Sequence, residues 1–319
     1  MYRTVLPEMN AIFSDVQDGG RFSPRVYLTQ RDSTEQYLFE DLNAGGYILC
    51  DHFLGLNEAQ TKCVLEKLGQ FHATSLVYQE KHPKIVADMK NSAFRHHIDF
   101  CEKLVTDNTA HVIKILKEWP QFEQIAEKMH RNTGKAFTRK FLSIIERQDC
   151  QVNVILHSDV WTKNILILEN DEKQPLDAIF IDYQISYLGS PGIDFNNFLI
   201  TSVQLDVMNS DDKRNALIQH YYKSLKKTLL SLDYGFERIP TLQMLMAEIA
   251  NSEYFSYYSL LFSLPQTVLS EELAKDMDFP SFFDDKRTAV NRQDMFSNER
   301  VLATYKYMLP RFNKLGLLD

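Results

Sequence analysis

Two short apolar runs that enclose a polar loop constrain the fold of this chain more than any other feature. The runs at 152–156 and 165–168 are rich in β-branched and aliphatic residues, a composition typical of buried strands. Between them lies the octapeptide HSDVWTKN, which carries His157, Asp159 and Asn164. This pattern predicts a polar loop held between two buried strands.

A third apolar run, at 178–181, ends in Asp182. The polar residues 169–173 before it are typical of a turn. The second and third runs therefore predict a hairpin that brings Asp182 back beside Asn164.

Such a cluster has the groups that phosphoryl transfer requires. That reaction needs a carboxylate near the attacking hydroxyl, and oxygen ligands for the Mg²⁺ that bridges the nucleotide phosphates. Because Mg²⁺ keeps several waters, one Asp and one Asn suffice as protein ligands. We assign the hydroxyl contact to Asp159 and the metal contacts to Asn164 and Asp182.

These residues also resemble a known family. HSDVWTKN followed by IDYQ resembles the protein-kinase catalytic loop and its metal-binding segment. The resemblance is closer to the choline and aminoglycoside phosphotransferases, and closest to the ecdysteroid kinase-like proteins, in which a Trp often stands where Trp161 stands here. Four more segments resemble motifs of that family in the same order: VLP at 5–7, YLFEDL at 37–42, GQFHA at 69–73 and GSPGIDF at 189–195.

The resemblance implies an α+β, protein-kinase-like fold with two lobes. It divides the chain into an incomplete N-lobe at 1–42 and a mainly helical C-lobe at 43–319 that carries the catalytic loop. It implies ATP and Mg²⁺ as cofactors, and a small-molecule alcohol, such as an ecdysteroid, as the acceptor. The residues expected around the adenine are the interlobe hinge, Phe39, Glu40, Asp41 and Leu42, and a floor made of Leu166 and Ile181.

Two further residues take structural roles by this resemblance. His157 is expected to bond the backbone around the metal-binding Asp, although as a general base it would compete with Asp159. Asp194 is expected to anchor the catalytic loop from the start of a helix, where a carboxylate is favoured. Ser158 departs from the family, which usually has Gly at that position, and Ser adopts the backbone angles open to Gly less easily.

The N-terminal part lacks some kinase features. A kinase N-lobe carries a Gly-rich phosphate loop and a Lys that contacts the phosphates, yet the first Lys of this chain is Lys62. We expect the chain to begin inside the N-lobe and to have weak or no activity as written.

Composition excludes other classes of function. The 319 residues carry a net charge of −8, which gives no hint of a surface for nucleic acid, and no run is long and apolar enough to span a membrane. The N-terminus lacks the apolar core of a signal peptide, and the four cysteines lack metal or redox spacing. We expect a cytoplasmic protein with reduced thiols and predict no protein partner.

The rest of the chain is predicted to be mostly helical. Asn57 and Gln60 form a capping box pattern before a long helix at 57–79, and Thr138 is expected to be the N-cap of the helix that leads into the catalytic strand. Three later helical stretches are expected at 211–232, at 242–264 (ended by Pro265) and at 297–309.

Three histidines and one aromatic run have alternative interpretations. His72 is interpreted as a core residue bonded to an acceptor, and the pair His96 and His97 as solvated surface or as the rim of a substrate pocket. The aromatic run at 254–262 is either core packing or the wall of an apolar acceptor pocket, and periodicity does not separate the two.

Three functions remain open on these grounds. The first is an ATP-dependent kinase of a lipophilic alcohol. The second is a pseudokinase-like binding protein, which the missing phosphate loop favours. The third is a choline- or aminoglycoside-type phosphotransferase, which predicts an acidic or cation-stabilising acceptor pocket.

Overall fold

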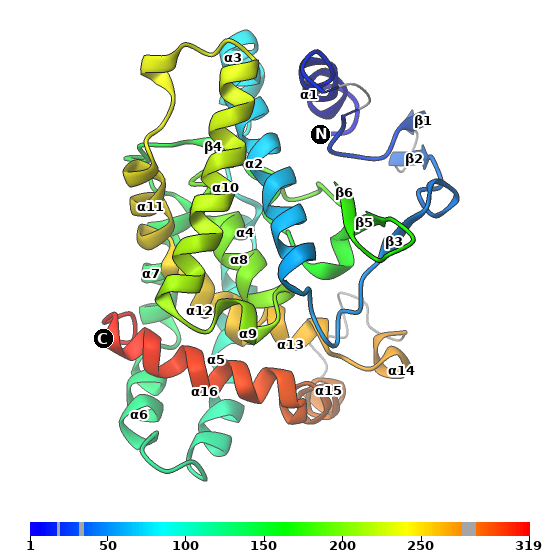
Figure 1. The fold of residues 1–319 in the computed structure, drawn as a ribbon. Coiled ribbons are helices and arrows are strands. Elements are labelled where there is room, and N and C mark those ends of the chain that lie inside the picture. The colour runs from blue at the N-terminus through cyan, green and yellow to red at the C-terminus, as the bar shows by residue number, and fades with distance from the viewer. Residues whose placement is uncertain (18–19, 32–34, 276–284) are drawn as a thin grey trace.

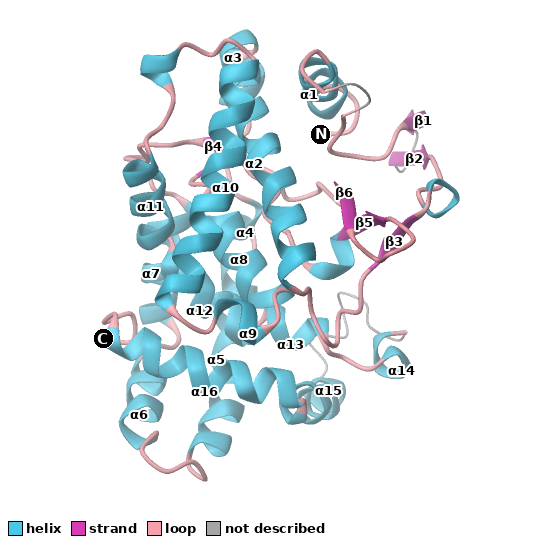
Figure 2. Ribbon diagram, in the orientation of Figure 1, coloured by secondary structure: helices cyan, strands magenta, loops and turns pink. Residues whose placement is uncertain are grey.

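A computed structural model describes residues 1–17, 20–31, 35–275 and 285–319. Strands β1, β2, β3, β5 and β6 lie on one side of the molecule, next to the N-terminal segment, whereas β4 lies among the helices that make up most of the remainder (Figures 1 and 2). The elements in chain order are α1 (Val5–Ser14), β1 (Val26–Arg31), β2 (Glu35–Phe39), η1 (Asn43–Gly45), β3 (Tyr47–Leu49), α2 (Glu58–Lys81), α3 (Pro83–Ala87), α4 (Ala93–His96), α5 (Ile98–Leu116), α6 (Glu123–Arg131), α7 (Lys135–Ile145), β4 (Val154–Ile155), η2 (Thr162–Asn164), β5 (Ile165–Glu169), β6 (Pro175–Phe180), β7 (Leu188–Gly189), α8 (Gly192–Ser202), α9 (Leu205–Met208), α10 (Asp211–Ser231), η3 (Phe236–Arg238), α11 (Leu242–Asn251), α12 (Glu253–Leu261), α13 (Ser263–Thr267), α14 (Glu271–Ala274), α15 (Asp285–Ser297) and α16 (Glu299–Lys314).

The strands form small antiparallel sheets around the predicted loop. β1 pairs with β2, and β5 lies between β3 and β6. The register of the β5–β6 hairpin sets Ile165 opposite Phe180 and Leu166 opposite Ile179. This hairpin confirms the predicted return of the chain toward Asn164. The sequence also predicts a polar turn at 31–33, and residues 32–34 lie outside those that the structure describes.

The helix α2 organises the helical part. Asn57 and Gln60 form the predicted capping box at its start, and α10 packs along it (Figure 1). The two helices approach closely at Gly69, where an added Cβ would lie 2.8 Å from the carbonyl oxygen of Tyr221.

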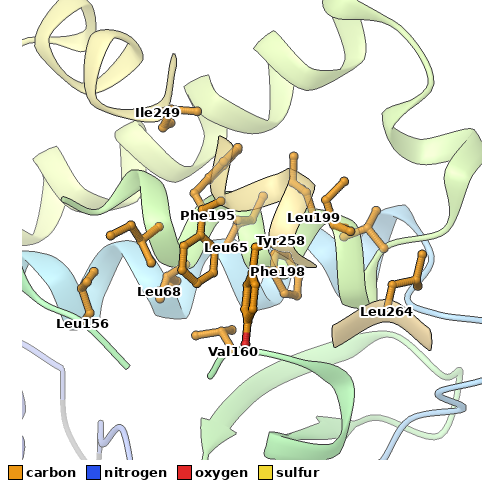
Figure 3. Packing of buried hydrophobic residues seen from close by; sticks show 14 of the residues in the cluster. Leu65, Leu68, Leu156, Val160, Phe195, Phe198, Leu199, Ile249, Tyr258 and Leu264 are labelled. Carbon is orange, nitrogen blue, oxygen red and sulfur yellow. The ribbon is translucent and has the colours of Figure 1, made fainter. Parts of the chain in front are cut away.

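The core lies beside the loop at 157–164. Side chains from α2, α8, α11 and α12 meet there with residues of the loop itself (Figure 3). Those labelled in the figure are Leu65, Leu68, Leu156, Val160, Phe195, Phe198, Leu199, Ile249, Tyr258 and Leu264. The loop therefore rests on a packed, buried layer, which restricts its movement.

Some predicted boundaries were wrong. Helix α7 begins at Lys135 with Gly134 as N-cap, and Thr138 lies inside it, where its hydroxyl bonds Glu102. The stretch at 242–264 is three helices, and Pro265 lies inside the third, α13. A proline is tolerated there because N–H groups of a helix's first turn have no helical acceptor.

The overall class agrees with the prediction. A small strand-bearing part carries the N-terminus, and a larger, mainly helical part follows, which is an α+β arrangement. Among the described residues, no helix has the length and apolar character needed to cross a membrane.

Candidate active site

His157 is fixed by hydrogen bonds at both ring nitrogens. Its Nε2 donates to the carbonyl of Ile181 at 2.8 Å, and its Nδ1 accepts the N–H of Asp159 at 3.2 Å. Burial lowers the pKa of His157 to about 4, so the ring is neutral at pH 7. Since both nitrogens are engaged, the ring ties the loop to the end of β6 and has no nitrogen directed at a substrate.

Asp194, in the first turn of α8, is fully buried beneath the loop. Its Oδ2 accepts the N–H of His157 at 2.8 Å, and its Oδ1 accepts the N–H of Ser158 at 2.7 Å. Ser158 has a φ of 71°, a left-handed conformation that is uncommon for a residue with a side chain. The carboxylate therefore holds the loop in a conformation that the sequence alone disfavours.

His72 reinforces Asp194 from the side of α2. Its Nε2 lies 3.1 Å from Asp194 Oδ2, and its Nδ1 lies 2.6 Å from the hydroxyl of Tyr221 on α10. A carboxylate only accepts, so Nε2 donates to it and Nδ1 accepts the tyrosine hydroxyl. The buried His72 is thus a core residue bonded to acceptor and donor, as its interpretation required.

Asp159 and Asn164 contact each other directly. The amide nitrogen of Asn164 donates to Asp159 Oδ2 at 2.9 Å and to the Asp159 carbonyl at 3.0 Å. Burial, with the nearby charge of Asp182 adding to it, raises the pKa of Asp159 to about 7, although the bond from Asn164 opposes the shift. The carboxylates of Asp159 and Asp182 therefore repel each other when no cation lies between them.

Asp182 follows β6 in a left-handed conformation, with a φ of 64°. Its N–H donates to the hydroxyl of Tyr2 at 2.9 Å, and the preceding N–H, of Ile181, donates to the carbonyl of Asn164 at 3.0 Å. Burial raises the pKa of Asp182. The structure thus brings Asp182 beside Asn164, as the hairpin predicted.

The donor set fits Mg²⁺ better than a softer metal. The part of the chain that the structure describes contains no group of three or more His, Cys, Asp and Glu side chains able to hold a metal. Mg²⁺ needs only one or two carboxylates, because waters and phosphate oxygens complete its shell. The raised pKa values of Asp159 and Asp182 are those of carboxylates whose ionised form a divalent cation would stabilise.

A cavity of about 1060 Å³ lies beside Asp182. Its lining includes Phe39 at the end of β2 and the following Glu40, Asp41 and Leu42, with Leu166 and Ile181. All the residues predicted to surround adenine thus lie on one cavity, together with Asp182.

The side chains of Glu40 and Asp41 have structural partners. Glu40 forms an ion pair with Arg21 and accepts the N–H of Arg25 at 2.7 Å, and its own N–H donates to the Arg25 carbonyl. Asp41 Oδ1 accepts the N–H of Asn43 at 2.9 Å. This segment is therefore held in place by its acidic side chains and faces the cavity.

A second cavity, of about 280 Å³, adjoins Asp159. Its lining includes the rings of Phe94, Phe100, Phe255, Tyr258 and Phe262, together with Ser158 and Asp159. We name it the aromatic pocket. Gln184 lines both this pocket and the larger cavity, so the two adjoin at the catalytic loop.

The aromatic run at 254–262 contributes to the core and also lines the aromatic pocket. Tyr254 is a core residue whose hydroxyl donates to Asn132 at 3.1 Å, and Tyr257 packs against Phe312. Phe255 and Tyr258 also belong to the core, and together with Phe262 and His97 they line the aromatic pocket.

Sequence reasoning did not identify Tyr2, Gln184 or the aromatic rings of α4 and α5 as parts of this region. Tyr2 is separated from Asp182 by 180 positions and carries no motif. Phe94 and Phe100 carried no motif that would have marked them as pocket residues.

Known proteins similar to this chain include a family and a solved structure. A model of the ecdysteroid kinase-like family matches residues 1–234. A solved structure of an ethanolamine kinase from Plasmodium vivax is similar at 17% sequence identity and a TM-score of 0.43, over 90% of this chain and 73% of that one. A comparison with curated proteins gave no match. Because the family model covers well over half of the chain, this protein belongs to the ecdysteroid kinase-like family, a group of small-molecule kinase-like proteins.

Proposed function

We propose that this chain is an ATP- and Mg²⁺-dependent phosphotransferase that transfers the γ-phosphoryl group to a hydroxyl of a lipophilic alcohol. One observation carries the proposal: Asp159 lines the aromatic pocket and contacts Asn164, whose neighbour Asp182 lines the larger cavity. An alcohol in the pocket and a nucleotide in the cavity would therefore meet at the catalytic loop.

Asp159 would accept the proton of the attacking hydroxyl. The bond from Asn164 to its Oδ2 orients the carboxylate. This carboxylate does not need to be a strong base, because positioning and charge neutralisation supply most of the catalysis of phosphoryl transfer. Asn164 and Asp182 would hold Mg²⁺, which would neutralise charge on the phosphates.

The hinge would read the adenine edge through its backbone. The N–H of Glu40 donates to the Arg25 carbonyl, so other backbone groups of the hinge would meet the adenine. Leu166 and Ile181 would pack against the ring from the other lobe.

The aromatic rings that line the pocket favour an acceptor whose body is apolar. Its rings would exclude water around the alcohol and gain roughly 25 cal/mol for each Å² of apolar surface buried. By family resemblance the acceptor would be an ecdysteroid or another lipophilic alcohol. Aromatic rings also attract quaternary ammonium groups, which keeps a choline-like acceptor as the alternative.

A comparison of choline with its neutral tert-butyl isostere separates these two acceptor classes. The two alcohols have the same shape and differ in charge. We expect the neutral alcohol to be phosphorylated with the higher kcat/KM, and a preference for choline would support the amino-alcohol alternative.

The charge of the larger cavity predicts slow turnover. Its described lining includes the acidic residues Glu35, Glu40, Asp41, Asp88 and Asp182, and neither Lys nor Arg. With no side-chain cation on the phosphates, we expect a rate well below the roughly 1–100 per second of ordinary kinases. The same observation favours a nucleotide- or alcohol-binding protein as the second candidate function.

Calorimetric titration with ATP tests the nucleotide site directly. We expect ATP to bind in the presence of Mg²⁺ and to lose most of its affinity in EDTA, because acidic side chains repel the uncomplexed phosphates. Equal affinity in both buffers would remove the proposed metal site from the account.

A further inference from the structure

Tyr2 lies where the N-terminal part of the chain meets the proposed metal site. Its half-buried ring packs edge-on against Phe39, with the centroids 4.8 Å apart, and against Tyr183 at 5.8 Å. Its hydroxyl oxygen accepts the N–H of Asp182 at 2.9 Å. Tyr2 therefore contacts both the wall of the larger cavity and the backbone of Asp182.

Asp182 needs such support because its backbone conformation is unfavourable. A non-glycine residue in the left-handed region is strained and persists only where its surroundings hold it. Two of the hydrogen bonds around Asp182 are made by its neighbour Ile181. The Ile181 carbonyl accepts from His157 Nε2, and the Ile181 N–H donates to the Asn164 carbonyl. The bond to Tyr2 acts on Asp182 itself.

We propose that Tyr2 is a positioning residue for Asp182, and that its hydroxyl sets the affinity of the cleft for a divalent cation. The inference rests on the proposed role of Asp182 as a metal ligand. Without the hydroxyl, the Asp182 N–H loses its partner and the residue relaxes toward ordinary backbone angles, which turns its carboxylate away from Asn164. The ring contacts with Phe39 remain in a Tyr2→Phe variant, so the wall of the cavity keeps its shape.

Mn²⁺ binding in the presence of a non-hydrolysable ATP analogue tests the inference, because Mn²⁺ is read by electron paramagnetic resonance without turnover. We expect the Mn²⁺ Kd of Tyr2→Phe to rise by about 2- to 12-fold, the effect of losing one hydrogen bond of ordinary net strength. The control is Tyr305→Phe, which removes a hydroxyl bonded at 3.0 Å to the Leu260 carbonyl in the core. This variant should be less stable but should bind Mn²⁺ like the wild type.

An Asp182→Asn variant keeps the two claims apart. If Asp182→Asn loses Mn²⁺ binding while Tyr2→Phe keeps the wild-type Kd, the positioning role is wrong and the metal site stands. If Asp182→Asn binds Mn²⁺ as the wild type does, the metal site itself is wrong. If the Mn²⁺ Kd rises equally in Tyr2→Phe and Tyr305→Phe, the effect reflects a loss of overall stability, and the inference is wrong.

Discussion

Asp159 makes the metal-free protein less stable as the pH rises. Burial and the charge of Asp182 raise the pKa of its carboxyl from 3.8 to about 7 in the folded protein. Below pH 4 this carboxyl is protonated whether the chain is folded or unfolded, and it contributes nothing to the difference. Above pH 7 it is ionised in both states, but the folded state then holds a charge that its surroundings disfavour.

The size of this effect follows from the shift. One pKa unit corresponds to about 1.4 kcal/mol, so a shift of roughly three units corresponds to about 4 kcal/mol. Between about pH 5 and pH 8 the loss attributable to Asp159 is about 2–3 kcal/mol. His157 acts in the opposite sense, since burial lowers its pKa to about 4, and acid therefore destabilises the fold through it.

Urea unfolding of the wild type and of Asp159→Asn isolates the contribution of Asp159, because the His157 effect is common to both to first order. In EDTA the variant should gain about 2–3 kcal/mol over the wild type as the pH rises from about 5 to 8. Saturating Mg²⁺ should remove most of this gain, because a cation favours the ionised carboxylate. Asp99→Asn, an exposed replacement in the first turn of α5, controls for the loss of one charge. A pH-independent difference between the wild type and Asp159→Asn would refute the reasoning.

Three further variants test the loop and the pocket. Asp194→Asn keeps the shape but turns one acceptor into a donor facing a backbone N–H, so it should cost at least about 2 kcal/mol in urea unfolding; a cost below about 0.5 kcal/mol would contradict the anchoring role. Ser158→Gly relieves the left-handed conformation at 71° and should raise the free energy of unfolding by up to about 1 kcal/mol, whereas Ser158→Ala should not; equal effects of the two would contradict the strain. Phe262→Ala, at the aromatic pocket, should raise the KM for a lipophilic alcohol several-fold and leave the KM for ATP unchanged; a change confined to ATP would place the acceptor elsewhere.

Local patterns predicted much of the fold. The capping box of Asn57 and the β5–β6 hairpin depend on residues close in sequence, so spacing was enough to identify them. Helix α16 shows where spacing fails: it continues past Pro310 to Lys314, because the buried Phe312 packs in the core beyond the proline. Helix α7 is a similar case. Thr138 is a residue type that often caps helices, but the N-cap of α7 is Gly134.

In the candidate site, too, the local sequence patterns predicted only contacts between residues that lie close along the chain. The loop and hairpin patterns predicted the proximity of Asn164 and Asp182, whereas the bond from Asp182 to Tyr2 joins segments that no local rule connects. The aromatic pocket likewise combines helices distant in sequence, so periodicity could mark the rings of α12 as apolar but could not tell core from pocket. The division of the chain at residue 42 and the roles of the site residues stay predictions.

The most direct test of the account is transfer of label from γ-labelled ATP to a lipophilic alcohol in the presence of Mg²⁺, by the wild type and by Asp159→Asn. Unfolding curves and ATP titrations of both proteins show that each is folded and binds nucleotide. The account predicts slow but measurable phosphorylation of the alcohol by the wild type, and a loss of about 100-fold or more in the variant, which is typical for removal of a general base. An Asp159→Asn protein that keeps the full rate, or a folded, ATP-binding wild type that phosphorylates none of a panel of lipophilic alcohols, would contradict it.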